Sequence, residues 1–491
     1  MASRKSMAGQ RESNAALLGV LTLCVMSAQL GTSAVNVALP DLALWSGRGF
    51  EQAQWAVVAY LLTMTTTSLV IGYIADVVGR KRVLRVSLLV FVVASVACAV
   101  APHVWALTIA RVVQGGGAAA MTALPLALVR DAVAPDRSGA AMGLLGTAAA
   151  VGTAGGPAIG GILLGTWDWT AIFWAMIPLP ALAFMLLSWS HARAGALASS
   201  KPAEGRGPTA VRRRSHRQGG PKDGKRFDVA GSAVLTGAVM AYGVAFSGSI
   251  FAAGWSLGLL VVVALLLALL VSIERRAARP LLPHALIRTR SVGLGVVLNL
   301  VVGAVMMSTL VIGPFYLSGA LGLKGGAIGL AMAAGPVTSI CAGVAAGRLV
   351  DRGYPGRLMT VGLMTMAVAL LVLATLPRVL GLPGYLAGTV LLAPGYQLFM
   401  AANNTRVMTR VPPERRGTTS GILGLSRSLG LVTGSSAITM LFAAVAQLDR
   451  SGTVAVASAS LDHGLSLVFG GASFVLGTAA CGSWLADRGR A

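Results

Sequence analysis

Arg111, in the stretch RVVQGGGAAA, is the residue whose type and position most suggest chemistry. It stands inside an apolar run long enough to cross a membrane, where a charge is costly and usually functional. An uncompensated buried cation attracts an anion, so its side chain could bind an anionic or carbonyl-rich ligand. A structural arginine that extends its charge toward the membrane surface is the alternative. Arg427 also falls within an apolar run.

Titratable groups that could work with such an arginine lie elsewhere in the sequence. All 16 acidic residues stand in gaps between apolar runs, in the tails or at the ends of runs. No histidine lies within a run. Proton movement across a membrane usually relies on titratable groups along the path. Asp41, at the outer end of the first run, and Asp76, at the inner end of the second, are therefore the candidates for it.

The composition indicates that lipid surrounds most of the chain. Of 491 residues, 55% are hydrophobic and 11% are charged, whereas an ordinary soluble protein is about 25% charged. A membrane-spanning helix needs about 20 mostly apolar residues, and such runs predict 14 spanning helices. The runs are roughly 15–39, 52–75, 83–101, 104–129, 139–165, 171–190, 228–250, 255–273, 291–317, 325–347, 358–377, 382–404, 417–446 and 464–486.

The distribution of basic residues predicts the orientation. Most of the 39 Lys and Arg residues stand in alternate gaps, and the opposite gaps hold Arg48, Lys324, Arg378 and Arg450. Positive residues collect on the cytoplasmic side, so an even number of spans and two cytoplasmic termini are expected. This pattern accounts for the net charge of +23 without a nucleic-acid partner. The four cysteines lie within runs and form no CxxC pair, so no metal site and no cofactor are expected.

An internal repeat indicates two similar halves. PDRSGAAMGLLGTAAAVGTAGG, from Pro135, aligns with PERRGTTSGILGLSRSLGLVTG, from Pro413, and five glycines fall in one register. Such repeats are typical of transporters in which two bundles rock about a midplane site. The predicted parts are an N-terminal tail (1–14), a six-helix bundle (15–190), a basic cytoplasmic linker (191–227), two inserted helices (228–273), a second six-helix bundle (274–486) and a C-terminal tail (487–491).

The stretch GYIADVVGRKRVL, from Gly72, predicts a conformational latch at the cytoplasmic face. Gly72 allows close helix approach, Asp76 could meet basic residues or the N-terminus of a neighbouring helix, and Gly79 allows a tight turn. A second copy, GRLVD, begins at Gly347, and it favours a latch over a topology signal alone. The residues of the predicted latch are Gly72, Asp76, Gly79, Arg80, Asp351 and Arg352.

The stretch GTAGGPAIGG, residues 152–161, predicts a helix that bends and lets a neighbour slide closely against it. Proline-kinked packing alone is the alternative. Its residues of interest are Gly152, Gly156, Pro157, Gly160 and Gly161.

Several ordered motifs resemble the major facilitator superfamily, and specifically the fourteen-helix drug:proton antiporters of the EmrB/QacA type. GYIADVVGRKR resembles the family's loop motif between spans two and three, RVVQGGGAAA its fourth-span motif, and GTAGGPAIGG its fifth-span antiporter motif, a marker of exporters. AVNVALP resembles the end of span one, and PLLPHALIRTRS the stretch after the inserted helices. The resemblance implies an all-α integral membrane protein with the major facilitator fold, two six-helix bundles and two inserted helices.

The first span departs from the family pattern, because Gly31 stands where the family has an acid in L-D-x-T. In the family that carboxylate is implicated in proton and cation handling. Two hypotheses follow. Either proton coupling has moved to Asp41 or Asp76, or an unpaired Arg111 binds an anionic or carbonyl-rich substrate.

Polar and aromatic residues within the runs could line a cavity between the bundles, although most such groups serve helix packing. Met306 and Met307 could be adaptable cavity lining or could face lipid. The candidates for the substrate or proton pathway are Arg111, Gln114, Asn36, Asp41, Tyr316, Gln397 and Asn403, with Asn299 and Tyr396 as further polar groups.

These observations predict a secondary active exporter of hydrophobic or amphiphilic small molecules, coupled to protons and working by alternating access. A facilitator or importer without proton coupling, and an exporter of anions bound by Arg111, are the alternatives. No enzyme activity and no ATP use are expected, because no GxxxxGK[ST] motif is present. The expected partners are a small-molecule substrate, protons and the lipid bilayer of the inner membrane. In a host with an outer membrane, a periplasmic adaptor would join them.

Overall fold

The computed structural model describes most of the chain, in nine segments. They are residues 2–47, 50–132, 135–199, 229–246, 253–276, 289–352, 354–412, 416–435 and 458–488. Every regular element in these segments is a helix. Most of the predicted basic linker, most of the stretch PLLPHALIRTRS and the end of the C-terminal tail lie outside the described residues.

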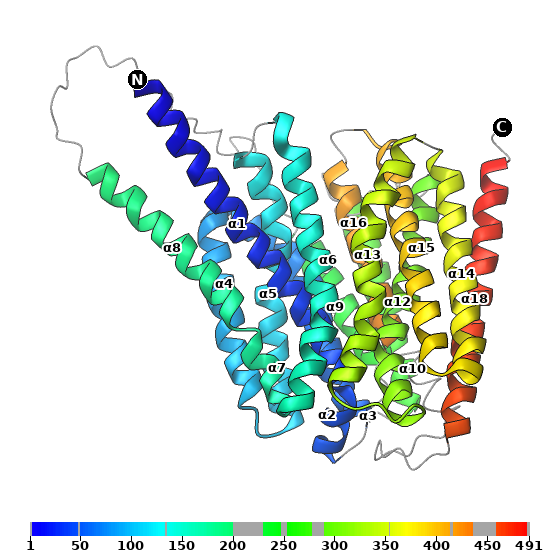
Figure 1. The fold of residues 1–491 in the computed structure, drawn as a ribbon. Helices are drawn as coiled ribbons and strands as arrows, with labels where there is room; N and C mark the ends of the chain where they lie inside the picture. Colours follow the sequence, from blue (N-terminus) through cyan, green and yellow to red (C-terminus); the bar gives the residue numbers. More distant parts are fainter. Residues whose placement is uncertain are drawn as a thin grey trace, which may run out of the picture.

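The N-terminal helices lie side by side in one group, coloured blue to teal in Figure 1. Two of them, α2 and α7, are short. The group consists of α1 (Ala2–Val37), α2 (Leu39–Ser46), α3 (Phe50–Val78), α4 (Arg80–Ala99), α5 (Val104–Ala132), α6 (Pro135–Thr166), α7 (Thr170–Ala175) and α8 (Pro178–Ser199).

The C-terminal helices form a second group, coloured light green to red in Figure 1. It consists of α12 (Arg290–Gly319), α13 (Gly326–Arg352), α14 (Pro355–Leu380), α15 (Leu382–Met408), α16 (Arg416–Thr433) and α18 (Ser458–Arg488). Two further helices, α9 (Val229–Phe246) and α10 (Ala253–Arg276), pack against each other, and α9 contacts both α3 and α16.

Each of the apolar runs identified in the sequence overlaps a helix of the structure. Within the described residues, ten helices are long and apolar enough to cross a membrane. Shorter apolar stretches lie in α9, α10 and α16, at Ala233–Ala245, Val261–Ile273 and Gly421–Thr433. The total of fourteen crossings stays a prediction.

The outer surface of the helices is apolar. Ile109 is 66% exposed, Leu265 is 64% exposed and Phe474 is 74% exposed. Many other leucine and valine side chains also face outward, and so large an apolar exterior would drive aggregation in water. The hydrocarbon of a bilayer is the solvent that accepts it, so the protein is a multi-pass membrane protein.

Glycines of the sequence repeat make equivalent contacts in the two groups. A methyl group added at Gly152 would lie 3.0 Å from Cβ of Gln29, because α6 packs directly on the backbone of α1. A methyl group added at Gly430, the aligned position, would lie 3.0 Å from Cα of Leu300, because α16 packs in the same way on α12. Only glycine permits such close approach of two helix backbones. The aligned glycines therefore hold α6 to α1 and α16 to α12.

Candidate functional site

Arg111 lies in the interior of the N-terminal group and is fully buried. Its Nε donates a hydrogen bond to the carbonyl oxygen of Ala56 on α3 at 2.6 Å, and its Nη2 donates to the carbonyl oxygen of Gly31 on α1 at 3.0 Å. Its Nη1 donates to Oε1 of Gln114 at 2.5 Å. These acceptors are all neutral. The guanidinium therefore joins α1 and α3 to α5 through backbone carbonyls, and no described carboxylate pairs with it.

A second layer of contacts holds this arginine in place. Nε2 of Gln114 donates to Oγ of Ser95 on α4 at 2.7 Å. The guanidinium carbon of Arg111 lies 4.0 Å from the centre of the Tyr60 ring, a cation–π contact. The Tyr60 hydroxyl donates to the carbonyl oxygen of Ala28 at 2.8 Å. The network thus spans four helices of one group.

Gly31 has no room for a side chain in this arrangement. A methyl group added there would lie 2.9 Å from Oη of Tyr60 and 3.3 Å from Cζ of Phe91. Glycine at this position lets the Tyr60 ring cover Arg111. The structure therefore gives a physical reason for the missing first-span acid.

A cavity of about 300 Å³ lies where the two groups of helices meet. Residues of α1 and α6 line one wall, and residues of α12, α13, α15 and α16 line the other. The volume is at the lower end of the range for small-molecule sites. Arg111 is not among the lining residues, whereas Arg427 on α16 is. The arginine exposed to this cavity is therefore Arg427.

The cavity is closed at the ends of the helices that the sequence predicts to be extracellular. There, a methyl group added at Gly161 of α6 would lie 2.6 Å from the backbone nitrogen of Gly329 of α13, and one added at Gly165 would lie 3.0 Å from that of Gly326. Figure 1 shows α6 and α13 drawing together toward the end opposite the chain termini. The two groups thus meet through glycine at this outer contact.

A second contact closes the same end on the other side of the molecule. Gln54, near the start of α3, donates hydrogen bonds to the carbonyl oxygen of Ser435, just after α16, and to its Oγ at 3.5 Å. Because Gln54 and Ser435 come from different groups, this pair also bridges the two halves.

Within the described residues, the glycines at the opposite, inner ends of the helices have open space around them. Methyl groups added at Gly72 of α3, Gly347 of α13, Gly146 of α6 or Gly424 of α16 would meet no atom within 4 Å. The close helix approach that the sequence predicts at Gly72 therefore stays a prediction. With the predicted orientation, the cavity would open toward the cytoplasm.

The comparisons with known proteins agree with this arrangement. A family model described as Major Facilitator Superfamily matches residues 21–435. The chain belongs to the Major Facilitator Superfamily.

Curated relatives of this superfamily member are transporters. It is 30% identical over 429 residues to "Uncharacterized transporter YebQ" of Escherichia coli, covering 86% of this chain and 87% of that one. It is 29% identical over 419 residues to "Multidrug resistance protein Stp" of Mycobacterium tuberculosis, covering 84% and 72%. Homologues of the chain thus include drug-resistance transporters.

Solved structures support the fold. The crystal structure of the peptide transporter POT in complex with sulfate matches with a TM-score of 0.67 at 15% identity, over 96% of this chain and 94% of that one. At this identity the likeness concerns the fold alone, and it is the fold of a major facilitator transporter.

Some of the other residues predicted for the substrate pathway of this superfamily member line the cavity, and some do not. Gln397, Tyr396 and Met306 line the cavity. The buried Tyr316 ring stacks on Tyr385, another lining residue, with ring centres 6.1 Å apart. The structure therefore brings these aromatic and polar groups of the second half together.

The predicted asparagines lie away from this cavity. Asn36 Nδ2 donates to the carbonyl oxygen of Thr32 in its own helix at 3.1 Å. Asn403 on α15 donates to the carbonyl oxygen of Gly295 on α12 at 3.2 Å, and Asn299 donates to that of Leu423 at 2.7 Å. In this conformation the amides of Asn403 and Asn299 join two helices each, and that of Asn36 bonds within its own helix.

Two of the predicted acidic residues, Asp41 and Asp351, lie near the ends of long helices. Asp41 is exposed on α2, just beyond the outer end of α1, and partial burial raises the pKa of its carboxyl. Asp351 and Arg352 are exposed at the inner end of α13, and Gly79 has a φ of 102° in the turn before Arg80. The side chain of Asp76 lies outside the described part of the structure.

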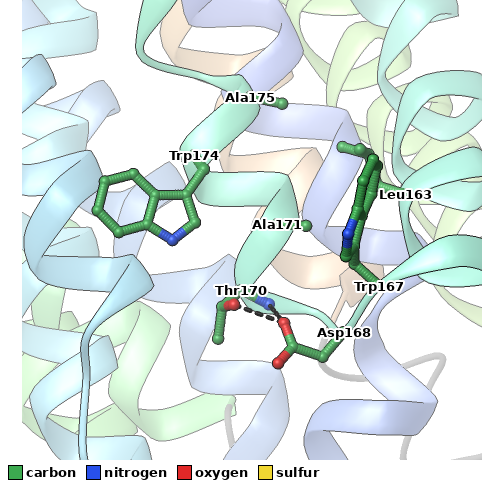
Figure 2. A pocket seen from close by; sticks show the side chains of 7 residues that line it. All are labelled: Leu163, Trp167, Asp168, Thr170, Ala171, Trp174 and Ala175. Carbon is green, nitrogen blue, oxygen red and sulfur yellow. Dashed lines mark hydrogen bonds between the residues drawn. The ribbon is translucent and has the colours of Figure 1, made fainter.

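A separate pocket of about 520 Å³ lies at the outer surface beside α7 (Figure 2). Its Asp168 Oδ1 accepts a hydrogen bond from the backbone nitrogen of Thr170 at 3.0 Å, which fixes the start of α7. Trp167 and Trp174 flank it on different sides of the helix (Figure 2). Exposed tryptophans at a helix end are typical of the membrane interface, so this pocket is assigned to the interface.

Sequence reasoning missed the importance of Arg427 and also missed Gln29, Thr389 and Tyr385 as lining residues. The one signal for Arg427 was its position within an apolar run, which it shares with Arg111.

Proposed function

We propose that this protein is a secondary active exporter of hydrophobic or amphiphilic small molecules that works by alternating access. The observation that carries the proposal is the cavity between the two groups of helices, with close glycine contacts at one end and glycines in open space at the other, within the described residues. A transporter needs such an asymmetry, because its site must reach one side of the membrane at a time. The drug-resistance relatives support export as the direction.

The glycines provide a route for the change of access. Opening the outer end requires Gly161 and Gly329 to separate, and closing the inner end brings together helices that carry Gly72, Gly146 and Gly424. Because both ends carry glycine, either can form a close helix contact while the bundles rotate as rigid bodies. The latch residues Asp351 and Arg352 stand at the inner end, where closure would bring them toward the other bundle.

We propose the proton gradient as the energy source. No Asp, Glu or His is among the described residues that line the cavity, so protonation would act on the ends of the helices, at Asp41 or Asp76. A facilitator that carries its substrate without protons is the second candidate, and the same lack of titratable lining residues favours it.

We propose the following architecture and orientation. Two six-helix bundles, 15–190 and 274–486, are joined by a cytoplasmic linker and the inserted helices α9 and α10. Both termini are cytoplasmic in the inner membrane. Arg111 then serves to hold its bundle rigid while the bundles rock, since its donors are occupied within that bundle.

Flux in inside-out vesicles tests the proposed function. Vesicles that contain the protein are expected to accumulate a lipophilic antibiotic when their lumen is made acidic. This class of compound is chosen because relatives of the chain are drug-resistance transporters. Accumulation that does not respond to the pH gradient would support the facilitator. The medium outside an inside-out vesicle corresponds to the cytoplasm. Release of a preloaded compound into this medium, against the concentration gradient of the compound, would therefore show import instead.

A further inference from the structure

The cavity has an unbalanced charge. Arg427 is exposed to it, and the described lining residues include no carboxylate. Within the described part of the chain, no ion pair or hydrogen bond engages the Arg427 guanidinium. The remaining polar lining groups are neutral amides and hydroxyls, such as Gln29, Thr153 and Gln397.

The two arginines of the membrane interior differ in what they can still bind. All three guanidinium nitrogens of Arg111 already donate to Ala56, Gly31 and Gln114. A ligand could not reach them without breaking a fully buried network. Arg427 instead lines a space large enough for a small molecule, and its side chain is exposed. Of these two arginines, Arg427 is therefore the one that a ligand in the cavity could reach.

We propose that Arg427 is the anion-recognition residue of the central cavity and that the preferred substrates are acidic amphiphiles. This inference rests on the proposed function and names its substrate class. A guanidinium binds a carboxylate, sulfonate or phosphate through two parallel hydrogen bonds, and such charged bonds are the strong ones. A fixed cation repels a cationic compound in the cavity, because no carboxylate of the described lining offsets it.

The walls of the cavity suit the rest of such a molecule. Met306, Met332 and Met400 give an apolar, adaptable surface, and Tyr385 and Tyr396 add aromatic faces. Gln29 and Thr153 stand on the N-terminal wall, across from Arg427 on the C-terminal wall. A ligand with an acidic group at one end and a flat apolar body would therefore contact both bundles at once, as a substrate that drives their movement must.

Binding of three pyrene probes that differ in charge tests the inference. Pyrenebutyrate, its methyl ester and pyrenebutyl trimethylammonium share one aromatic body with charges of about −1, 0 and +1. The full chain in lipid nanodiscs, with empty nanodiscs as blank, is expected to bind pyrenebutyrate about tenfold more tightly than the cation. Equal affinity for all three probes, or preference for the cation, would overturn the proposal.

Variants of the same side chain locate the effect. Arg427→Gln is expected to weaken pyrenebutyrate binding about tenfold and to leave ester binding within about twofold, whereas Arg427→Lys keeps part of the preference. Retained ester binding shows that the variant is folded. Arg410→Gln removes an exposed charge at the end of α15, outside the cavity, and is expected to change nothing. Equal loss of all three probes in Arg427→Gln would also overturn the proposal.

Flux separates this inference from the proposed function. If pyrenebutyrate binds through Arg427 and proteoliposomes fail to move it, the anion site stands and the export function fails. If the cation or the ester is exported and pyrenebutyrate neither binds nor moves, the export function stands and the anion site fails.

Discussion

Arg111 donates a hydrogen bond to the backbone carbonyl of Gly31 at 3.0 Å, at the position where the related antiporter pattern carries an acidic side chain. The arginine is therefore satisfied without a carboxylate. The hydrogen-bond network of Arg111 joins four helices, and Arg427 is the arginine that lines the cavity.

Gly31→Ala is expected to destabilise the protein, because the new methyl group would lie 2.9 Å from Oη of Tyr60. Overpacking of this kind costs about 1–3 kcal/mol. Thermal unfolding of the purified protein measures the effect. Gly19→Ala, in the same helix with no atom within 4 Å of the added methyl, is the matched control and should be neutral or slightly stabilising. Equal unfolding temperatures for the two variants would contradict the packing of Tyr60 on Gly31.

Arg111→Lys is expected to lose transport of every substrate, whatever its charge. A lysine ammonium cannot reach the three acceptors that the planar guanidinium bridges, and breaking a buried charge network costs about 3–5 kcal/mol. Transport of the three pyrene probes and thermal unfolding would be measured together. Selective loss of the anionic probe, with normal stability, would instead place Arg111 in the binding site.

Gly161→Val is expected to slow export, because the added side chain separates α6 from α13 and disfavours the conformation closed at the outer end. A penalty of about 1–3 kcal/mol shifts the balance between conformations about 5- to 150-fold. Initial export rates in vesicles measure it. Gly155→Val is the control on the same helix, since its methyl would contact only Cδ1 of Ile159 at 3.7 Å. If both variants transport equally, the glycine contact is not the outer gate.

Asp41→Asn tests where protons act. Burial raises the pKa of the Asp41 carboxyl, so the folded protein keeps this proton at a pH where a free aspartate, with a pKa of about 3.9, has lost it. Its contribution to stability is full at acidic pH and decreases as the pH rises through the raised value.

If Asp41 carries the coupling proton, Asp41→Asn abolishes the response of export to an imposed pH gradient and leaves movement down a substrate gradient. Asp168→Asn, which changes another carboxylate at the outer surface, is the control. An unchanged response in Asp41→Asn would move the coupling site elsewhere, with Asp76 as the next candidate.

The helices were predictable from sequence because hydrocarbon imposes one rule on every span. An apolar run of sufficient length has to satisfy its backbone internally, and only a helix does so. The glycine register was informative for a similar reason. Gly152 and Gly430 pack on α1 and α12 because no larger residue allows two backbones so close.

The identity of the cavity arginine was not predictable. Arg111 and Arg427 both interrupt apolar runs, and the direction in which each points depends on how its helix is rotated against its neighbours. The partners of Arg111 are mainly backbone carbonyls, at Gly31 and Ala56, and every residue has one. A sequence search for a carboxylate partner therefore finds none, even though the charge is fully satisfied.

The central claim is that the two ends of the molecule open and close in opposition, and paired distances measure it most directly. Spin labels at cysteines replacing Thr166 and Lys324 report the outer end, and labels at Val78 and Tyr354 report the inner end, with Cys341 and Cys481 changed to Ser. On addition of pyrenebutyrate under an imposed pH gradient, the outer distance is expected to increase in the same population in which the inner distance decreases. Distances that stay fixed, or that lengthen at both ends together, would contradict the account.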